Sequence, residues 1–329
     1  MRNLQIAIAL AILCHPGPAS DAPISTAQRV PRQIIRIGHF PNITHAQALI
    51  AHRLSRTGDG WFEQRLGDGV SIQWFVYNAG PAAMEAIFAG SIDLTYVGPS
   101  PAVNAYVRSN GNEIRVVAGA VTGGAALVMQ SNDHFDGPAD FRGKKIATPE
   151  FGNTQDIACR VWLTAQGFKV TPLGGDVQVI PTANPDQITL FQRGVIDGAW
   201  TVEPWVSRLE LEAKGVIYLE QTDSITTVFV SSAKFLREHR DLAAALIRAH
   251  TELTDWINQH PSEAKALVRA ELTEEMKHDF SQQIIDKAWP RLRFTTEISR
   301  APFADFLAQA KRVGFLYKSA DLSRLVETP

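Results

Sequence analysis

The sequence contains little cysteine, with two such residues among 329. Cys14 lies in the apolar N-terminal segment, so removal of that segment leaves Cys159 alone, and a lone cysteine cannot form an internal disulfide. Cys159 lies among apolar residues on a predicted helix, which favours a buried core residue over a catalytic thiol. The nine histidines are scattered and no Cys/His spacing fits zinc, so the sequence predicts no metal site.

The sequence also lacks the common signatures of hydrolases, nucleotide-binding proteins and nucleic-acid-binding proteins. It has no serine nucleophile elbow and no phosphate-binding loop with its lysine. It has no long basic run and its formal net charge is -2, so nucleic acid is not an expected partner.

The composition is that of a soluble globular protein, with 45% hydrophobic and 20% charged residues, and the length allows two domains. The N-terminus has the pattern of a secretory signal: Arg2, an apolar run at 4–13 and small residues at 17–22. The run is too short for a permanent membrane anchor. We therefore predict a signal peptide at 1–22 and export of the protein. Leu13 is bulkier than the small residue that lipoprotein processing needs, so cleavage is favoured over lipid attachment at Cys14.

A short pattern occurs twice, at residues 86–99 and 190–204. In each copy, apolar residues at helical spacing run into a glycine, followed by x-Ile-Asp, a short apolar stretch, an aromatic residue and a proline. Glycine after a helix end adopts the left-handed conformation without steric cost, and proline suits the first turn of the next helix. The two copies indicate two α/β lobes built alike. The loop after each strand is where an open α/β sheet binds ligands.

Strands and helices alternate along the chain, which predicts mostly parallel sheets. The strands of the first lobe are expected at 34–40, 70–77, 92–97 and 114–121. The chain is then expected to cross near 122–124 and to return in a strand at 225–230, with hinges near 122–124 and 225–228. The apolar spacing after residue 234 predicts helices at 241–258, 261–270 and 273–288.

Four loops that open helices carry glycine, hydroxyl or amide residues, at 41–45, 78–81, 98–101 and 152–155. A helix N-terminus offers unpaired N–H donors and the positive end of the helix dipole. Four such ends at one cleft would bind an oxyanion without an arginine, although capping alone explains each loop by itself. His45 follows Thr44 at a helix start, and a ligand contact and a surface position are both open. Trp200 matches Tyr96 of the first copy, which favours a place in the wall of the cleft.

Several stretches of the sequence, taken together, resemble those of the sulfonate, nitrate and taurine substrate-binding proteins of ATP-binding-cassette importers. The resemblance runs from about residue 34 into the last third of the chain. It is specific as a set, and it is carried by Arg36-Ile37-Gly38, Gly80-Pro81 with Glu85-Ala86, Gly90-Ser91-Ile92-Asp93, Gly143-Lys144-Lys145-Ile146-Ala147, Gly152-Asn153-Thr154-Gln155-Asp156, Gly194-Val195-Ile196-Asp197-Gly198-Ala199-Trp200 and Glu203-Pro204.

The resemblance implies an α/β, two-lobed type II periplasmic-binding-protein fold with two inter-lobe crossings and a helical C-terminal region. Lobe 1 would comprise residues 34–121 and 229–329, and lobe 2 residues 122–228. No catalysis and no cofactor are implied. The implied partners of this periplasmic monomer are a small anionic or zwitterionic ligand and the membrane permease of the importer. The ligand-binding residues implied are Asn42, Thr44, His45, Asn78, Gly80, Gly98, Pro99, Ser100, Thr122, Asn153, Thr154, Gln155, Trp200 and Glu203.

The leading hypothesis is capture of a small oxyanion, an organosulfonate such as taurine or an alkanesulfonate, for delivery to the importer. Nitrate or bicarbonate binding is an alternative, because the motifs do not separate these ligands. An enzyme resembling the thiamine-pyrimidine synthases is a second class, but their cysteine-rich motif is absent and the signal segment argues against an intracellular enzyme. A ligand-sensing regulator is a third class, but no helix-turn-helix precedes the lobes.

Glu203 follows Trp200 on the loop where ligand-facing groups are expected. A carboxylate would repel a simple anion, so its role is left open among three. It could stabilise the first turn of the helix that starts at Pro204, where the dipole favours acidic residues. It could pair with the ammonium of an aminosulfonate, or contact the importer or the opposite lobe. The helix-end role is favoured, because it applies to any glutamate there.

Overall fold

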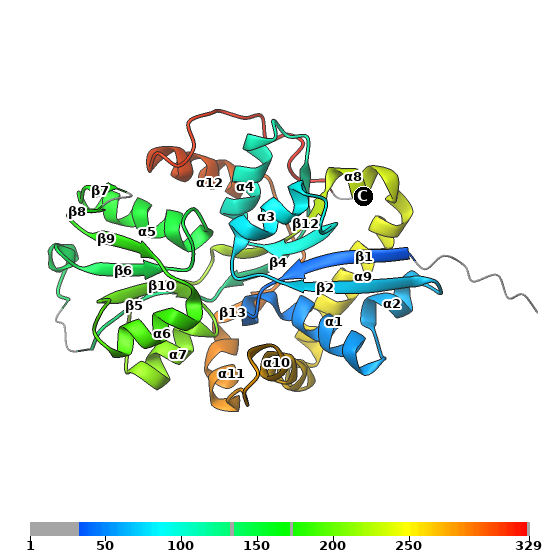
Figure 1. Ribbon diagram of the computed structural model, residues 1–329, viewed down its shortest axis with the longest axis horizontal. Helices are drawn as coiled ribbons and strands as arrows, with labels where there is room; N and C mark the ends of the chain where they lie inside the picture. Colours follow the sequence, from blue (N-terminus) through cyan, green and yellow to red (C-terminus); the bar gives the residue numbers. More distant parts are fainter. Residues whose placement is uncertain (1–32, 132–134, 172–173, 328–329) are drawn as a thin grey trace, which may run out of the picture.

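The structure, a computed structural model, describes residues 33–131, 135–171 and 174–327. The predicted signal peptide at 1–22, with Cys14, lies outside these described residues. The chain forms two α/β lobes, each built around its own β-sheet, which lie beside one another in Figure 1. The two-lobed fold that the sequence predicts is therefore confirmed.

Lobe 1 contains a six-stranded sheet in the order β13-β4-β12-β3-β1-β2. Its strands are β1 (Gln33–His39), β2 (Val70–Val76), β3 (Leu94–Val97), β4 (Ile114–Gly123), β12 (Ile225–Ser232) and β13 (Leu292–Phe294). Successive side chains of a strand face opposite sides of a sheet. Accordingly, Phe229 packs into the hydrophobic core on one face of the sheet, while Val228 and Val230 pack into the core on the other face.

Helices cover both faces of the lobe 1 sheet (Figure 1). The face that Phe229 occupies is covered by η1 (Ile43–His45), α1 (Ala46–Thr57), α2 (Trp61–Leu66), α8 (Ala233–Glu238), α9 (Arg240–Gln259), α10 (Pro261–Met276) and α11 (Gln282–Ala288). The opposite face is covered by α3 (Gly80–Phe88), α4 (Pro99–Arg108) and α12 (Ala301–Arg312). The C-terminal helices thus return to lobe 1, as the sequence predicts.

Lobe 2 contains a five-stranded sheet in the order β11-β5-β10-β6-β9. Its strands are β5 (Ala125–Met129), β6 (Lys145–Thr148), β9 (Gln178–Pro181), β10 (Gly198–Val202) and β11 (Val216–Gln221), beside a short pair of β7 (Val170–Thr171) and β8 (Gly174–Gly175). Its helices are η2 (Pro138–Phe141), α5 (Thr154–Ala165), α6 (Asn184–Gln192) and α7 (Trp205–Ala213). Cys159 of α5 is buried in the core of this lobe, which confirms its interpretation as a core residue.

The expectation of mostly parallel sheets is wrong, because both sheets are mixed. β1 pairs in parallel with β2 and β3, but β12 is antiparallel to β3 and β4. In lobe 2, β6 is parallel to β9 and β10, but β5 is antiparallel to β10 and β11. The reason is the double crossing. A strand that arrives from the other lobe starts at the cleft and runs away from it, opposite to strands that end at the cleft.

Helix boundaries differ from the prediction in the C-terminal region. The predicted helix 273–288 is two helices, because α10 continues to Met276 and Lys277 then adopts a left-handed conformation with φ of 57°. α11 begins only at Gln282. The short elements α2, β11 and β13 carry too little periodicity to be predicted. The crossings themselves lie at Gly123–Gly124 and at residues 222–224, between β11 and β12.

The repeated pattern forms equivalent units in the two lobes, α3–β3–α4 and α6–β10–α7. Gly90 and Gly194 both adopt the left-handed conformation that the pattern predicts, with φ of 67° and 65°. Ile92 and Ile196 are both buried. The two copies therefore share backbone conformation as well as sequence.

The aspartate of each copy ties its strand to the neighbouring parallel strand. The Asp93 carboxylate accepts a hydrogen bond from the Arg36 backbone N–H, and the Asp93 N–H donates to the Arg36 carbonyl, each at 2.8 Å. Asp197 makes the same pair of bonds with Lys145, at 2.8 and 2.9 Å. Each aspartate thus fixes the register in which β3 or β10 runs towards the cleft.

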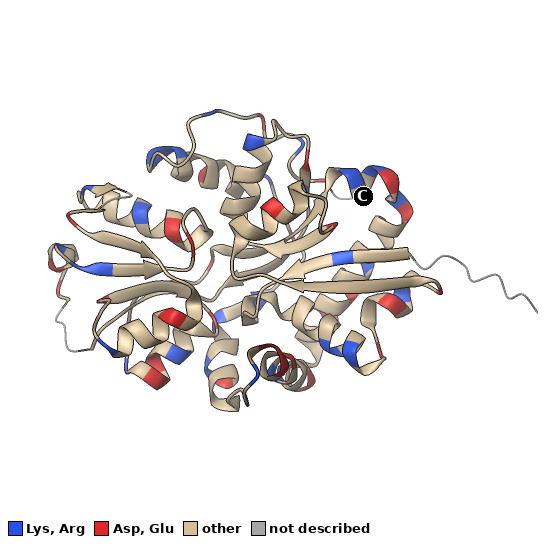
Figure 2. Ribbon diagram, in the orientation of Figure 1, with Lys and Arg blue, Asp and Glu red and all other residues tan. Residues whose placement is uncertain are grey.

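In the view of Figure 2, the Lys, Arg, Asp and Glu positions are spread mainly over the helices of both lobes. In the described part of the chain, no helix combines the length and the apolar character that a bilayer span requires.

Candidate functional site

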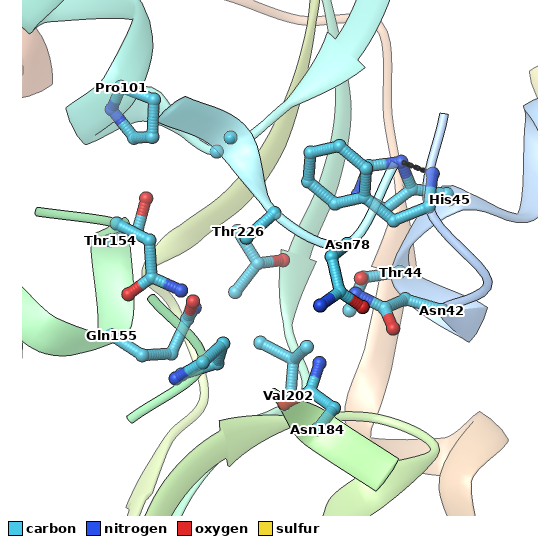
Figure 3. A pocket seen from close by; sticks show the side chains of 16 residues that line it. Asn42, Thr44, His45, Asn78, Pro101, Thr154, Gln155, Asn184, Val202 and Thr226 are labelled. Carbon is cyan, nitrogen blue, oxygen red and sulfur yellow. Dashed lines mark hydrogen bonds between the residues drawn. The ribbon is translucent and has the colours of Figure 1, made fainter. Parts of the chain in front are cut away.

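A cavity of about 30 Å³ lies between the lobes. Its walls include Phe40 and Gly98, which follow β1 and β3, and Pro149 and Val202, at the ends of β6 and β10. The cavity thus sits where the carboxyl ends of the strands of both lobes meet. One water needs about 10–15 Å³ of such volume, so the lobes are nearly closed on each other. Sixteen residues line the cavity (Figure 3): Phe40, Asn42, Thr44, His45, Asn78, Ala79, Gly80, Gly98, Pro101, Pro149, Asn153, Thr154, Gln155, Asn184, Val202 and Thr226.

Four helices begin at this cavity, two from each lobe. Lobe 1 contributes the starts of α3 at Gly80 and of α4 after Gly98. Lobe 2 contributes the starts of α5 at Thr154 and of α6 at Asn184. The N-terminus of each helix carries a partial positive charge and unpaired N–H groups, so the four helix starts create a positive electrostatic potential in the cavity.

The cavity lining carries amides and hydroxyls but no Asp, Glu, Lys or Arg side chain. Its one ionisable side chain is His45, which is buried. Burial, with a smaller contribution from nearby His39, lowers the pKa of His45 well below 6.5, against the opposing pull of Glu275. The Phe40 N–H donates to Nδ1 of His45 at 3.4 Å, which leaves the proton of the neutral ring on Nε2. The site is therefore uncharged and rich in donors.

Most of the predicted ligand residues meet at this cavity. Those that line it are Asn42, Thr44, His45, Asn78, Gly80, Gly98, Asn153, Thr154 and Gln155. Pro99 and Ser100 form the buried first turn of α4 directly after Gly98. The Ser100 N–H donates to Oγ1 of Thr154 at 3.3 Å across the lobes, and the Ser100 hydroxyl has no hydrogen-bond partner among the described residues. A buried hydroxyl without a partner is costly, so this one is available to a ligand.

Thr122 and Trp200 lie away from the cavity. Thr122 is near the end of β4, where its hydroxyl accepts from Nε of Arg293 at 3.3 Å. The indole of Trp200 packs into the lobe 2 core and donates to Oε1 of Gln221 at 3.0 Å, so it is not a wall of the cleft. Val202, at the end of β10, reaches the cavity instead, whereas Trp200 lies further back along the strand.

Glu203 is fully buried beside the hinge and does not line the cavity. Its carboxylate accepts from the backbone N–H and the hydroxyl of Ser207 at 3.0 and 2.9 Å, in the first turns of α7. It also accepts from Arg291 at 2.8 Å, in the segment that leads into β13 of lobe 1. Desolvation raises the pKa of Glu203, and the bonds from Arg291 and Ser207 oppose the rise. The helix-end role and the contact with the opposite lobe are both present, and the carboxylate does not point to solvent.

Sequence reasoning missed several lining residues, among them Asn184, Thr226 and Val202. Asn184 opens α6, and the dipeptide Asn184-Pro185 carries the same helix-start signal as the four predicted loops. Thr226 lies at the start of β12, where no local signal distinguishes a cavity residue from a core residue.

A second cavity of about 350 Å³ adjoins the first and shares Asn42, Asn78 and Asn184 with it. Its remaining walls combine apolar and charged side chains: Pro41, Pro185, Trp205, Arg208, Glu275, Met276 and His278. The Trp205 indole of lobe 2 donates to Oδ1 of Asn42 of lobe 1 at 2.7 Å, so this wall also joins the lobes.

The structure contains a candidate metal-ligand cluster that the sequence did not lead us to expect. Beside the second cavity, whose wall includes Glu275, the side chains of His39, His52 and Glu275 bring one ligand atom each to within 4.8 Å of one another. Their positions in β1, α1 and α10 lie far apart in the sequence, so spacing alone did not reveal them.

Comparison with known proteins identifies the family and related folds. The model of the NMT1-like family matches residues 28–272. The taurine-binding periplasmic protein of Escherichia coli K12 is 26% identical over 185 residues, which are 55% of this chain and 56% of that protein. A putative aliphatic sulfonates-binding protein of Bacillus subtilis is 24% identical over 275 residues, 82% of this chain and 78% of that protein. The alkanesulfonate-binding protein SsuA from Xanthomonas axonopodis pv. citri, bound to MOPS, superposes with a TM-score of 0.73 at 17% identity, over 91% of this chain and 99% of that one.

Proposed function

This chain belongs to the NMT1-like family, and from that premise we propose that it is an extracytoplasmic binding protein that captures an organosulfonate between its lobes. Its partner is the membrane permease of an ATP-binding-cassette importer, and it acts as a monomer. The relatives whose names describe taurine and sulfonate binding support this proposal. It assigns no catalytic role to the chain.

The observation that carries the proposal is the convergence of four helix N-termini on a cavity without a charged side chain. Such a site stabilises an oxyanion through backbone N–H groups and helix dipoles. Ser100 and Thr154, which face each other from α4 and α5, supply hydroxyls to the same oxyanion. A cation would face the positive ends of these helix dipoles with no carboxylate in the lining to pair with it, and is disfavoured.

The second cavity favours an organosulfonate over a bare inorganic anion. It offers about 350 Å³ directly beside the anion position, with Trp205, Met276 and Pro185 as apolar walls. The substituent of a sulfonate would extend into this space while the sulfonate oxygens stay at the helix ends. Nitrate or bicarbonate binding is the second candidate, because the first cavity by itself has only about 30 Å³.

A ligand panel separates these candidates. Thermal unfolding and isothermal titration are measured with methanesulfonate, longer alkanesulfonates, taurine, nitrate and bicarbonate. Binding stabilises the folded state by mass action, so sulfonates should raise the melting temperature, and affinity should rise with chain length. Nitrate or bicarbonate that binds as tightly as every sulfonate would favour the second candidate, and no shift with any anion would refute both.

Two substitutions test the position of the anion. Ser100→Ala and Thr154→Val each remove a hydroxyl from the helix ends that face the cavity. A hydrogen bond to a charged group contributes roughly 1.5–3 kcal/mol, so affinity should fall about tenfold to a hundredfold while the melting temperature without ligand stays close to the wild-type value. If both variants bind like the wild type, the anion lies elsewhere.

Cellular location is tested by sequencing the N-terminus of the mature protein from a fractionated native host. A periplasmic fraction whose protein begins near residue 23 supports export and cleavage. A chain that retains Met1 in the cytoplasm would contradict the proposed role in import.

A further inference from the structure

We propose that His39, His52 and Glu275 form a binding site for a divalent transition-metal ion, with Zn²⁺ as the representative ion, inside lobe 1 and apart from the anion cavity. The three residues come from β1, α1 and α10 and are almost completely buried. None of the three lines the cavity that holds the anion in the proposed function, so this inference does not depend on that function.

The three ligand atoms form a nearly equilateral triangle. Nε2 of His39 lies 3.1 Å from Nδ1 of His52 and 3.1 Å from Oε1 of Glu275, and the latter two atoms are 3.2 Å apart. Zinc bonds to imidazole and carboxylate are about 2.0–2.1 Å long, so two ligands of a tetrahedral ion are separated by roughly 3.3 Å. The observed edges fall within about 0.2 Å of that separation, the tolerance expected of a metal site.

Two neutral imidazoles beside ionised carboxylates leave contacts of this triangle unmatched. Nδ1 of His52 also lies 2.9 Å from Oε1 of Glu271, so four close contacts compete for the protons on two ring nitrogens. With one proton, at least one contact brings two lone pairs together. With both nitrogens protonated, each has a carboxylate acceptor, but two N–H donors then lie only 3.1 Å apart. A cation between the three atoms turns each of their lone pairs into a ligand and removes the conflict within the triangle.

Two carboxylate oxygens at the cluster point to the same conclusion. Oε2 of Glu275 and Oε2 of Glu271 are buried and have no hydrogen-bond partner among the described residues. The side chains of Glu275 and Glu271 are only 3% and 0% exposed. An unpaired buried carboxylate oxygen is costly, and a bound cation would offset this cost directly for Glu275.

Neighbouring residues hold the ligand side chains in position, as residues around the direct ligands do in metal sites. Nδ1 of His39 lies 3.3 Å from the Phe40 carbonyl, which fixes the proton there and leaves the Nε2 lone pair facing the cluster. Arg56 holds Glu271 at 2.8 Å, and the Trp74 indole stacks on the ring of His52. Glu275 lines the second cavity, so an ion has a path from the cleft and a water or another ligand has room at the open position.

The first test measures metal binding by the mature chain and its variants. Metal-free protein is titrated with Zn²⁺ in competition with a chromophoric chelator, and the bound metal is counted after dialysis. Wild type should bind one equivalent. Glu275→Gln and His52→Gln should lower the affinity at least tenfold, since even outer-contact changes cost about 10–100-fold in metal affinity.

Matched controls distinguish the buried triad from surface histidines and carboxylates. Glu274→Gln changes the neighbouring, half-exposed carboxylate, which pairs with Lys277. His278→Gln changes a histidine in the wall of the same second cavity. Both controls should bind Zn²⁺ like wild type. If either control abolishes binding, or if Glu275→Gln leaves the affinity unchanged, the assignment is overturned.

A measurement on unmodified protein covers the case in which the triad variants do not fold. Co²⁺ bound by two imidazoles and a carboxylate in a low-coordinate site gives intense visible absorption, whereas Co²⁺ held by water or by surface groups gives only weak bands. Wild type with one equivalent of Co²⁺ should show the intense bands, and Zn²⁺ should displace them. Wild-type protein that shows no such bands and binds no Zn²⁺ refutes the proposal.

Discussion

His250 is a buried histidine that the fold holds in its neutral form. Its Nε2 faces the Gly119 carbonyl at 2.9 Å, and its Nδ1 faces the Tyr96 hydroxyl at 2.9 Å. A neutral ring that donates from Nε2 and accepts at Nδ1 satisfies both contacts. Desolvation lowers the pKa of His250 from 6.5 to about 4, partly opposed by the bond to Gly119. Protonation would place a proton on Nδ1, so the Tyr96 hydroxyl would have to change from donor to acceptor inside the lobe 1 core.

We expect stability to fall as the pH falls from about 6.5 to about 4. In this window the unfolded chain carries an extra proton on His250 and the folded chain does not. Acidification therefore lowers the free energy of unfolding, by up to about 3 kcal/mol. Urea unfolding of wild type and of His250→Gln at several pH values measures this effect. Glutamine does not titrate, so its curve should be flatter. His260→Gln, at the end of the same helix, should keep the wild-type slope, and parallel curves for wild type and His250→Gln would contradict the assignment.

Glu203 gives a prediction about ligand selectivity. Because its carboxylate is bonded to Ser207 and Arg291 away from the cavity, it should not recognise the ammonium group of an aminosulfonate. Glu203→Gln should therefore leave the ratio of affinities for taurine and ethanesulfonate unchanged. It should lower stability by about 1–3 kcal/mol through weakened hydrogen bonds to a buried charged group. Calorimetric titration with both ligands checks the ratio, and a selective loss of taurine binding would reinstate the pairing with ammonium.

At the scale of single elements, the sequence was informative where the signal is local. The glycine and the Ile-Asp pair of each repeat identified two equivalent units, because a left-handed glycine and a strand-tying aspartate act within a few residues of their own strand. Helix-start residues likewise marked the loops at 41–45, 78–81, 98–101 and 152–155, which all contribute to the cavity, although the start of α6 at Asn184 was missed.

The features that the sequence did not reveal depend on contacts between distant segments. The orientation of Trp200 is set by the pairing of β10 with its neighbours, which decides which face of the strand meets the core. Thr226 reaches the cavity only because β12 starts at the cleft. The His39, His52 and Glu275 cluster needs a strand and two helices to pack together, and no spacing in the sequence encodes that arrangement.

The starts of α4 and α5 face each other so closely that Gly98 controls their approach. A Cβ atom on Gly98 would lie 2.4 Å from Oγ1 of Thr154 in the other lobe. The backbone of Gly98 has φ of -67°, which an alanine adopts without strain, so the obstacle arises only when the lobes are closed.

Gly98→Ala should therefore weaken ligand binding without weakening the fold. We expect an unfolding free energy within about 0.5 kcal/mol of wild type and a clear loss of sulfonate affinity, measured by urea unfolding and calorimetric titration. Thr154→Ala removes the atom that the new methyl group meets. In that background, adding Gly98→Ala should cost much less affinity than it does in wild type. Equal losses in both backgrounds would show that Gly98 acts through something other than closure.

At the scale of the whole molecule, the lobes also contact each other outside the two crossings. Hydrogen bonds join Ser100 to Thr154, the Ile43 N–H to the Glu203 carbonyl and the Trp205 indole to Asn42. Arg291 pairs with Glu203, and Phe315 of the C-terminal region packs against Gly152 and Phe151 of lobe 2.

Opening of the cleft requires the bonds at its mouth, such as those of Ser100 with Thr154 and of Trp205 with Asn42, to break. We expect the hinge at the crossings, where Gly123 and Gly124 have φ of 79° and 74°.

Closure should therefore depend on ligand. A cavity of about 30 Å³ is too small to admit a sulfonate from solution, so the free protein must open before it binds. Small-angle scattering should give a larger radius of gyration for the free protein than for the protein saturated with ligand, whose profile should approach that calculated from this closed structure. Gly98→Ala should remain larger than wild type at saturation, because its methyl group keeps α4 and α5 apart. A radius that does not change although titration confirms binding would show that ligand enters without hinge motion, and the closed contacts between Ser100 and Thr154 would then be a fixed part of the fold.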